Sequence, residues 1–160
     1  MVRTGRYISL AALVAVIIVM TSGCDPSKQL EKDEVVKIQA YLSQNPDLNY
    51  ELKQSGLYYL DEVVGTGALA VTHDTAFTFY SGYFIDGTKF ATNIGTTDTL
   101  VYPVNEGWLI KGFDEAITYM KVGGKSKILM PGSLSYFDYT PRLFDIQLIK
   151  VIPGPGADGK

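Results

Sequence analysis

Aromatic side chains are the groups in this sequence whose positions most suggest a site. They fall on separate predicted elements, mostly on faces that should point inward. These residues are Tyr80, Phe90, Phe113, Tyr136 and Phe144. Rings that converge from distant segments build either an ordinary core or an apolar pocket. Composition alone favours the core and leaves the pocket as the alternative.

Groups that could transfer protons or bind phosphate are present, but not in arrangements that such chemistry needs. His73 precedes Asp74 without a Ser or Cys placed by any motif, so a surface pair is the simpler interpretation. Asp114-Glu115 begins a predicted helix, where acidic side chains complement the helix dipole. Gly124-Lys125-Ser126 leads into a strand, which argues against a P-loop. We therefore expect no hydrolytic site, no metal and no cofactor.

Length and composition limit the class of protein further. The 160 residues fit one compact domain with appendages, and 46% hydrophobic and 19% charged residues are not the composition of a disordered chain or a coiled coil. The formal net charge is -3, and no run of Lys or Arg occurs, which argues against nucleic acid as a partner. One Cys excludes an intramolecular disulfide and, with one His, argues against a structural zinc site.

The start of the chain has the order of an export signal. Arg3 and Arg6 precede an apolar run from Tyr7 to Met20, and small residues follow it. A run of about fourteen residues is shorter than the roughly 20 that span a bilayer, although a retained membrane anchor is the alternative interpretation.

The small residues that end this segment resemble a bacterial lipobox. Thr21 stands where an aliphatic residue is usual, and Cys24 stands where the lipidated cysteine would be. The resemblance implies a lipoprotein signal peptide over residues 1–23 and acyl chains on Cys24. We therefore expect the protein in the bacterial cell envelope, lipid-anchored on a periplasmic or outer-membrane face.

We expect a tether and an amphipathic helix over residues 24–55. Apolar residues recur at helical intervals through residues 29–44, until Asn45-Pro46 ends the pattern. These apolar residues are Leu30, Val35, Ile38 and Leu42. A folded domain follows over residues 56–152, and residues 153–160, rich in Pro and Gly, are predicted to form a flexible tail.

Within that domain the patterns are those of strands with one short helix. A helix is predicted over Gly112 to Met120, since Phe113, Ala116 and Ile117 share one face. Alternation and turn signals predict strands at Leu57–Val64, His73–Phe84, Lys89-Phe90, Thr99–Val104, Lys125–Met130 and Arg142–Val151. The fold class is therefore α+β, with an antiparallel sheet.

The order of these segments resembles the FKBP-type peptidyl-prolyl cis-trans isomerases from about Ser55 to Ile152. The resemblance rests on an ordered set of motifs, among them Phe79-Tyr80-Ser81-Gly82, Asp86-Gly87-Thr88-Lys89-Phe90, Ile110-Lys111-Gly112-Phe113 and Phe144-Asp145-Ile146-Gln147-Leu148. It implies an FKBP-like curved antiparallel sheet wrapped around the short helix. With the N-terminal lipobox and helix, the chain is similar to secreted FKBP-like lipoproteins of the Bacteroidetes type, including ones associated with gliding motility.

The resemblance also implies a pocket that binds proline between sheet and helix. Phe113 would form its floor, and the backbone N–H of Ile110 and the hydroxyl of Tyr136 would orient substrate carbonyls. The residues that fall at pocket positions of the family are Tyr80, Phe90, Leu100, Leu109, Ile110, Phe113, Tyr136 and Phe144.

Three departures from the family pattern bear on activity. Ala91 replaces an Asp after the pocket Phe, Leu100 replaces an aromatic wall residue, and Phe137 replaces a Gly after the pocket Tyr. Only Asp138 to Pro141 then separate Phe137 from the last strand, where relatives have a longer loop. A shorter loop opens the pocket to water, so weak turnover is expected.

The implied function is isomerisation of X-Pro bonds in envelope proteins, with proline-containing polypeptides as substrates and a monomer as the expected state. A non-catalytic chaperone or binding module anchored to the membrane is an alternative, and so is an inert structural lipoprotein. Phe77 and Phe79 favour a binding surface, because they point away from Tyr80 and need a cover, which the helix at residues 29–44 could provide.

Overall fold

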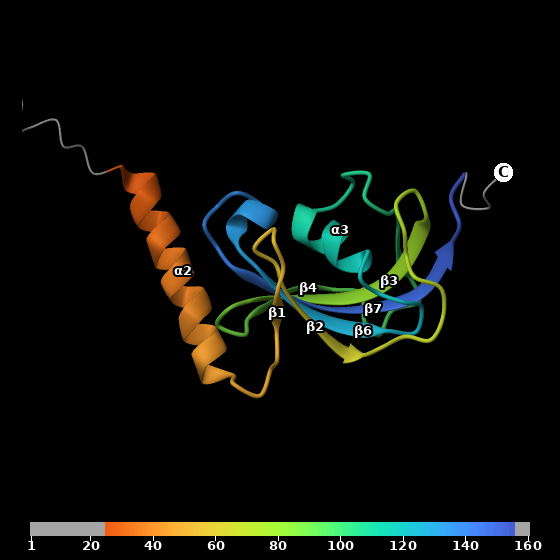
Figure 1. Ribbon diagram of the computed structural model, residues 1–160, viewed down its shortest axis with the longest axis horizontal. Helices are drawn as coiled ribbons and strands as arrows, with labels where there is room; N and C mark the ends of the chain where they lie inside the picture. The colour runs from red at the N-terminus through yellow and green to blue at the C-terminus, as the bar shows by residue number, and fades with distance from the viewer. Residues whose placement is uncertain (1–24, 156–160) are drawn as a thin grey trace, which may run out of the picture. The chain divides into compact units, whose positions relative to one another are not determined.

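The computed structural model describes residues 25–155 (Figure 1). The predictions for the signal peptide and Cys24, and for most of the C-terminal tail, lie outside these residues. Among the residues described, no helix has both the length and the apolar character needed to cross a membrane.

The domain is built on one antiparallel sheet of seven strands. The strand order is β1-β2-β6-β7-β3-β4, and β5 pairs with β3 outside this path. The strands are β1 (Glu51–Leu52), β2 (Tyr58–Val63), β3 (Thr75–Phe84), β4 (Lys89–Thr92), β5 (Leu100–Pro103), β6 (Lys125–Met130) and β7 (Arg142–Ile152). The α+β class predicted from the sequence, an antiparallel sheet with one short helix in the same domain, is confirmed.

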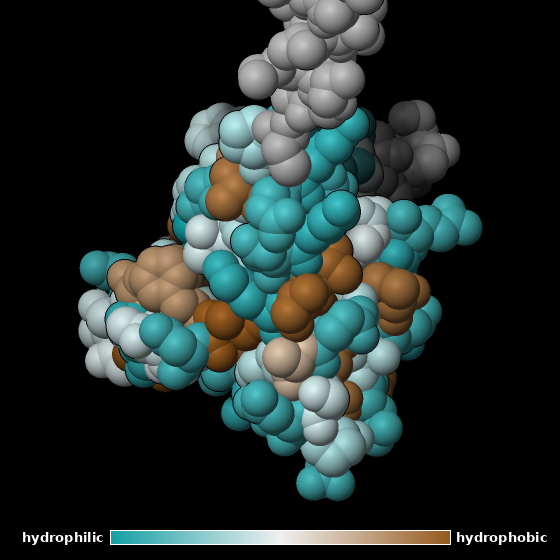
Figure 2. Space-filling model, turned by 90° about the vertical axis from the view of Figure 1, so that its left-hand side faces the viewer, coloured by the Kyte–Doolittle hydropathy of each residue, from teal (hydrophilic) through white to brown (hydrophobic). Residues whose placement is uncertain are grey.

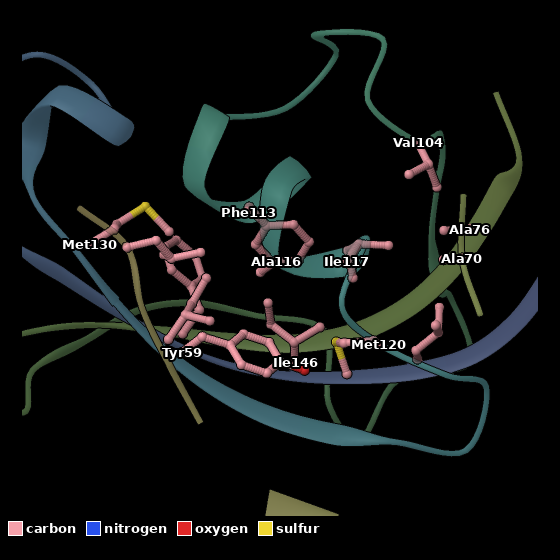
Figure 3. Packing of buried hydrophobic residues seen from close by; sticks show 14 of the residues in the cluster. Tyr59, Ala70, Ala76, Val104, Phe113, Ala116, Ile117, Met120, Met130 and Ile146 are labelled. Carbon is pink, nitrogen blue, oxygen red and sulfur yellow. The ribbon is translucent and has the colours of Figure 1, made fainter. Parts of the chain in front are cut away.

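The short helix α3 (Lys111–Ile117) lies against one face of the curved sheet (Figure 1). Its inward side chains Phe113, Ala116 and Ile117 point toward Ile146 of β7 (Figure 3). Strand β7 alternates as expected, with Phe144, Ile146 and Leu148 buried. The core therefore forms where one helix meets the alternating face of the central strands.

The helix ends earlier than the sequence suggests. Three residues beyond Ile117 continue as tighter turns, in which the backbone N–H groups of Thr118, Tyr119 and Met120 each donate to the carbonyl three residues before. Met120 is still fully buried. The apolar spacing therefore identified the buried face correctly and the end of the α-helix incorrectly.

The N-terminal helix α2 (Pro26–Gln44) begins three residues earlier than predicted. The predicted apolar stripe is wrong in part: Ile38 is buried, but Leu30 and Val35 are exposed, and Glu34 is buried in their place. In the compact unit that runs from Asp33 onward, Glu34 accepts a hydrogen bond from the backbone of Gly132. The buried side of the helix is therefore narrow and includes a carboxylate.

The prediction that α2 covers Phe77 and Phe79 has no hydrogen bond to support it among the described residues. Two hydrogen bonds that join α2 to the sheet domain run from Glu34 to the backbone of Gly132 and from Gln39 to Tyr58. Phe77 and Phe79 are half-buried, and the ammonium of Lys150 lies 5.3 Å from the centroid of the Phe77 ring. On the face shown in Figure 2, apolar side chains form a broken band among hydrophilic ones.

Two segments expected to be irregular are tied to the sheet. Glu51 and Leu52, in the predicted connector, pair with Tyr59 and Tyr58 as β1. Gly154, in the predicted tail, donates its backbone N–H to Asp74 at 3.0 Å. A Cβ on Gly154 would lie 2.0 Å from the backbone oxygen of His73, so this part of the tail packs closely on the start of β3.

Candidate active site

An apolar cavity of about 260 Å³ opens between α3, the sheet and two loops. The eight residues predicted to line a pocket all meet there. Its lining consists of Tyr80, Phe90, Ala91, Leu100, Trp108, Leu109, Ile110, Phe113, Tyr136 and Phe144. Sequence reasoning missed Trp108 as a lining residue. The sequence did indicate it, because Trp108, the only Trp of the chain, directly precedes Leu109 and Ile110, two residues that were predicted to line the pocket.

The rings at the base of the cavity hold one another edge to face. Phe113, which is 3% exposed, meets Tyr80 at a centroid distance of 5.7 Å and Phe144 at 5.5 Å, with interplanar angles of 84° and 88°. Phe90 meets Phe144 at 5.6 Å and 89°. Aromatic pairs prefer this geometry, so the floor and two walls are fixed by their own contacts.

Strand β3 brings Tyr80 to the cavity and Asn93 fixes the backbone there. The backbone N–H of Tyr80 donates to the side-chain oxygen of Asn93 at 2.7 Å, and the Asn93 amide donates to the carbonyl of Thr78 at 3.1 Å. Gly82 lies next on the same strand, where a Cβ would come within 2.9 Å of the rings of Phe90 and Phe144. The glycine therefore lets these two rings lie directly over the strand.

The loop before α3 carries three lining residues and is organised by Asp114. This carboxylate is buried and accepts the backbone N–H groups of Asn105 at 2.6 Å and Gly107 at 3.2 Å. Ile110 follows in an extended conformation, and we find no acceptor within residues 25–155 for its backbone N–H. Asp114 thus acts as a loop anchor, and the Ile110 N–H is available to a ligand.

The loop after β6 brings Tyr136 to the mouth of the cavity. Tyr136 is 58% exposed, and Arg142 places its guanidinium carbon 4.6 Å from the ring centroid. Phe137 is 67% exposed, has a φ of 59° and does not line the cavity. Lys111 lies 5.5 Å from the Phe137 ring. Phe137 therefore does not block the pocket.

Arg142 and Asp138 form the charged support of this loop. The guanidinium of Arg142 donates to both carboxylate oxygens of Asp138, at 2.9 and 2.6 Å. These hydrogen bonds hold the pKa of the Asp138 carboxyl below its usual value and raise the pKa of Arg142. The ion pair is therefore kept charged near neutral pH, beside the pocket and outside its lining.

The other residues considered for chemistry do not join the cavity. His73 is exposed, has a φ of 74° and pairs with Glu106. Asp74 is buried and accepts the backbone N–H groups of Val71 and Gly154, each at 3.0 Å. Within residues 25–155 there is no group of three His, Cys, Asp or Glu side chains that could hold a metal. The cavity offers apolar surface and hydrogen bonds and lacks an acid-base couple.

A protein-family model described as FKBP-type peptidyl-prolyl cis-trans isomerase matches residues 67–149. The FK506-binding protein of Neisseria meningitidis serogroup B is 30% identical over 105 residues, which cover 60% of this chain and 96% of that protein. The isomerase FkpA of Aeromonas hydrophila is 33% identical over 114 residues. That alignment covers 66% of this chain and 41% of FkpA, so the chain spans less than half of that relative.

Solved structures give the same result for the fold. The crystal structure of FkpA from Escherichia coli superposes with a TM-score of 0.68 and 23% identity, covering 95% of this chain and 75% of the other. The crystal structure of AtFKBP13 gives a TM-score of 0.60 and 28% identity, covering 64% of this chain and 98% of the other.

Proposed function

Because the chain belongs to the FKBP-type peptidyl-prolyl cis-trans isomerase family, we propose that it isomerises X-Pro peptide bonds in its aromatic cavity. The observation that carries the proposal is the cavity of about 260 Å³ with Phe113 at its base and rings from three strands and two loops around it. A proline ring is apolar and compact, and it fits a site of this size and character.

The chemistry needs no proton transfer. Rotation about an X-Pro bond is slow, taking tens to hundreds of seconds, because resonance keeps the amide planar. The planar form separates more charge than the twisted transition state does. A water-poor apolar pocket therefore penalises the planar form more and lowers the barrier, which is differential stabilisation of the transition state.

We assign the residues by their positions in the cavity. Phe113 contacts the face of the proline ring, with Tyr80, Phe90 and Phe144 as walls and Leu100 and Leu109 at the sides. The free N–H of Ile110 and the hydroxyl of Tyr136 bind the carbonyls on either side of the proline. Ala91 offers no polar group at the rim, so orientation depends on these two donors, and a low turnover follows.

A protease-free isomerase assay on the purified chain tests the proposal. Peptides containing Ala-Leu-Pro and Ala-Phe-Pro are the substrates, and Phe113→Ala and Tyr80→Ala are the variants. We expect catalysis by the wild type that both variants lose. The fluorescence of Trp108, the only tryptophan, reports binding separately, because this ring is 73% exposed and lines the cavity. Absence of catalysis in the wild type would refute isomerase function.

A second candidate function is a chaperone or binding module that holds polypeptides without isomerising them. The exposed rings of Trp108 and Tyr136 at the mouth favour it, because they add apolar contact area outside the floor. Peptide-dependent changes in Trp108 fluorescence, together with suppressed aggregation of an unfolded protein and no isomerase activity, would identify this function.

We further propose a lipid-anchored lipoprotein of the bacterial cell envelope, acting as a monomer on proline-containing envelope proteins. The order of charged, apolar and small residues before Cys24 supports it. Mass spectrometry of Cys24 tests lipidation, and Cys24→Ala should move the protein from the membrane to the soluble fraction.

A further inference from the structure

The helix α2 places a carboxylate in a buried position next to the pocket loop. Glu34 is 5% exposed, and its Oε1 accepts the backbone N–H of Gly132 at 2.6 Å, across 98 positions of sequence. Hydrogen bonds with an ionised partner are shorter and stronger than neutral ones. Burying a carboxylate without such a partner would be costly. The contact is therefore specific and its geometry is fixed.

Gly132 is the point where this loop begins. It starts a single-turn 3-10 helix, η1 (Gly132–Leu134), and Pro131 before it offers no side-chain cap. The first N–H groups of a helix have no acceptor within it. Glu34 supplies one from a different part of the chain, in the role that a capping side chain usually fills.

The backbone carbonyl of Gly132 fixes the segment that carries Tyr136. It accepts the backbone N–H of Ser135 at 3.0 Å and that of Phe137 at 2.7 Å. Tyr136 lies between these two residues, so the Gly132 carbonyl holds its backbone on both sides. A Cβ on Gly132 would lie 2.6 Å from the backbone N of Tyr139, so this group has little freedom to move.

We propose that Glu34 is a positioning residue for the isomerase site: by fixing Gly132 it sets where Tyr136 presents its hydroxyl to a substrate carbonyl. The inference rests on the proposed function and assigns a role to α2 within it. Glu34 does not line the cavity; it reaches the site through its hydrogen bond to the backbone of Gly132 and through the charge that it places near Arg142. The other side of the loop is held by Arg142, which donates to Ser135, Asp138 and Thr140.

The test compares Glu34→Ala and Glu34→Gln in the wild type and in Tyr136→Phe. Alanine removes the acceptor, whereas glutamine keeps an acceptor of the same length without the charge. We expect Glu34→Ala to lower kcat/KM about tenfold, as small misplacements of an orienting group do, and Glu34→Gln to restore most of it. Glu31→Ala, an exposed glutamate of the same helix, is the control and should have no effect.

The double variant separates positioning from a general loss of stability. If Glu34 acts through the Tyr136 hydroxyl, Glu34→Ala should lower kcat/KM in the wild type and have almost no further effect in Tyr136→Phe. Equal losses in both backgrounds would overturn the inference. An inactive wild type would instead refute the proposed function.

Amide hydrogen exchange tests the contact whether or not the protein is catalytic. In Glu34→Ala, exchange should quicken at Gly132, Ser135 and Phe137, and the NMR signals of the Tyr136 ring should shift. Exchange in β6 and β7 should not change. Unchanged loop exchange and unchanged Tyr136 signals would show that Glu34 does not hold the loop, and an equal increase at all sites would show general destabilisation instead.

Discussion

The guanidinium carbon of Arg142 lies 4.6 Å from the centroid of the Tyr136 ring. Arg142 is the first residue of β7, and Phe144, two residues later, forms a wall of the cavity. One strand end therefore provides both a wall and the support of the ring at the mouth. The guanidinium also reaches Asp138 and Thr140, so it fixes the short loop that it underlies.

Replacing this support by lysine should loosen the loop without removing its charge. Lysine cannot form the two parallel hydrogen bonds to Asp138 while also reaching Ser135 and Thr140. We expect Arg142→Lys to lower the free energy of unfolding by about 1–3 kcal/mol and to reduce kcat/KM. Urea unfolding and the isomerase assay measure the two effects. Lys121→Ala, at an exposed position, is the control, and equal stability of Arg142→Lys and wild type would contradict this account.

The ion pair also predicts a dependence of stability on pH. Hydrogen bonds from Arg142 hold the pKa of Asp138 below its usual 3.8 in the folded state. The stabilisation is therefore fully present above pH 3.8 and disappears as the pH falls below it, through the folded-state pKa. Unfolding free energies measured from pH 6 to pH 2 should fall less steeply for Asp138→Asn than for wild type. Asp47→Asn, which removes an exposed carboxyl elsewhere, should retain the wild-type slope.

Phe113 should affect both stability and activity. Its ring contacts Tyr80 and Phe144, and it is almost completely buried. We expect Phe113→Leu to lower the free energy of unfolding by about 1–2 kcal/mol and to lower kcat/KM much more than its effect on stability explains. Phe77→Leu, at a half-buried position outside the cavity, is the matched control. Equal kcat/KM for the two variants would exclude Phe113 as the floor of the site.

The contact of Gly154 with the start of β3 should make this position intolerant of a side chain. A Cβ there would overlap the backbone oxygen of His73, so the segment would have to move and Asp74 would lose one of its donors. We expect Gly154→Ala to destabilise the fold by about 1–3 kcal/mol in thermal or urea unfolding. Pro155→Ala, one exposed residue further, should be neutral. If Gly154→Ala left the stability unchanged, the sequence-based prediction of a flexible tail at this position would be correct.

The strands other than β1, the helix α3 and the eight lining residues could be predicted because their signals are local or were carried by an ordered set of motifs. Strand β7 alternates between buried and partly exposed residues from Arg142 to Leu148, with its buried side chains on one face. Ile110 and Phe113 lie close together at the start of α3, so the local helical spacing is enough to predict which way the Phe113 side chain points. Such patterns survive in the sequence without knowledge of the partner strand.

What the sequence could not show depends on contacts between distant segments. Leu30 and Val35 fit the helical period but lie exposed, whereas Glu34 is buried because its acceptor role is matched by the backbone of Gly132. Backbone donors leave no mark in side-chain patterns. Strand β1 is two residues long and exposed, too short for any periodicity. Gly154 looks like any flexible glycine until His73 is placed beside it.

The short loop between η1 and β7 leaves Tyr136 and Phe137 in solvent and does not fold across the entrance. With an uncovered entrance, no end of a substrate chain has to pass through the site. A proline in the middle of a long, partly folded chain can enter from the side and leave the same way. The residues on both sides of that proline would meet exposed rings at Trp108 and Tyr136. For the proposed isomerase function, this entrance predicts that prolines far from the ends of a polypeptide are accepted as substrates.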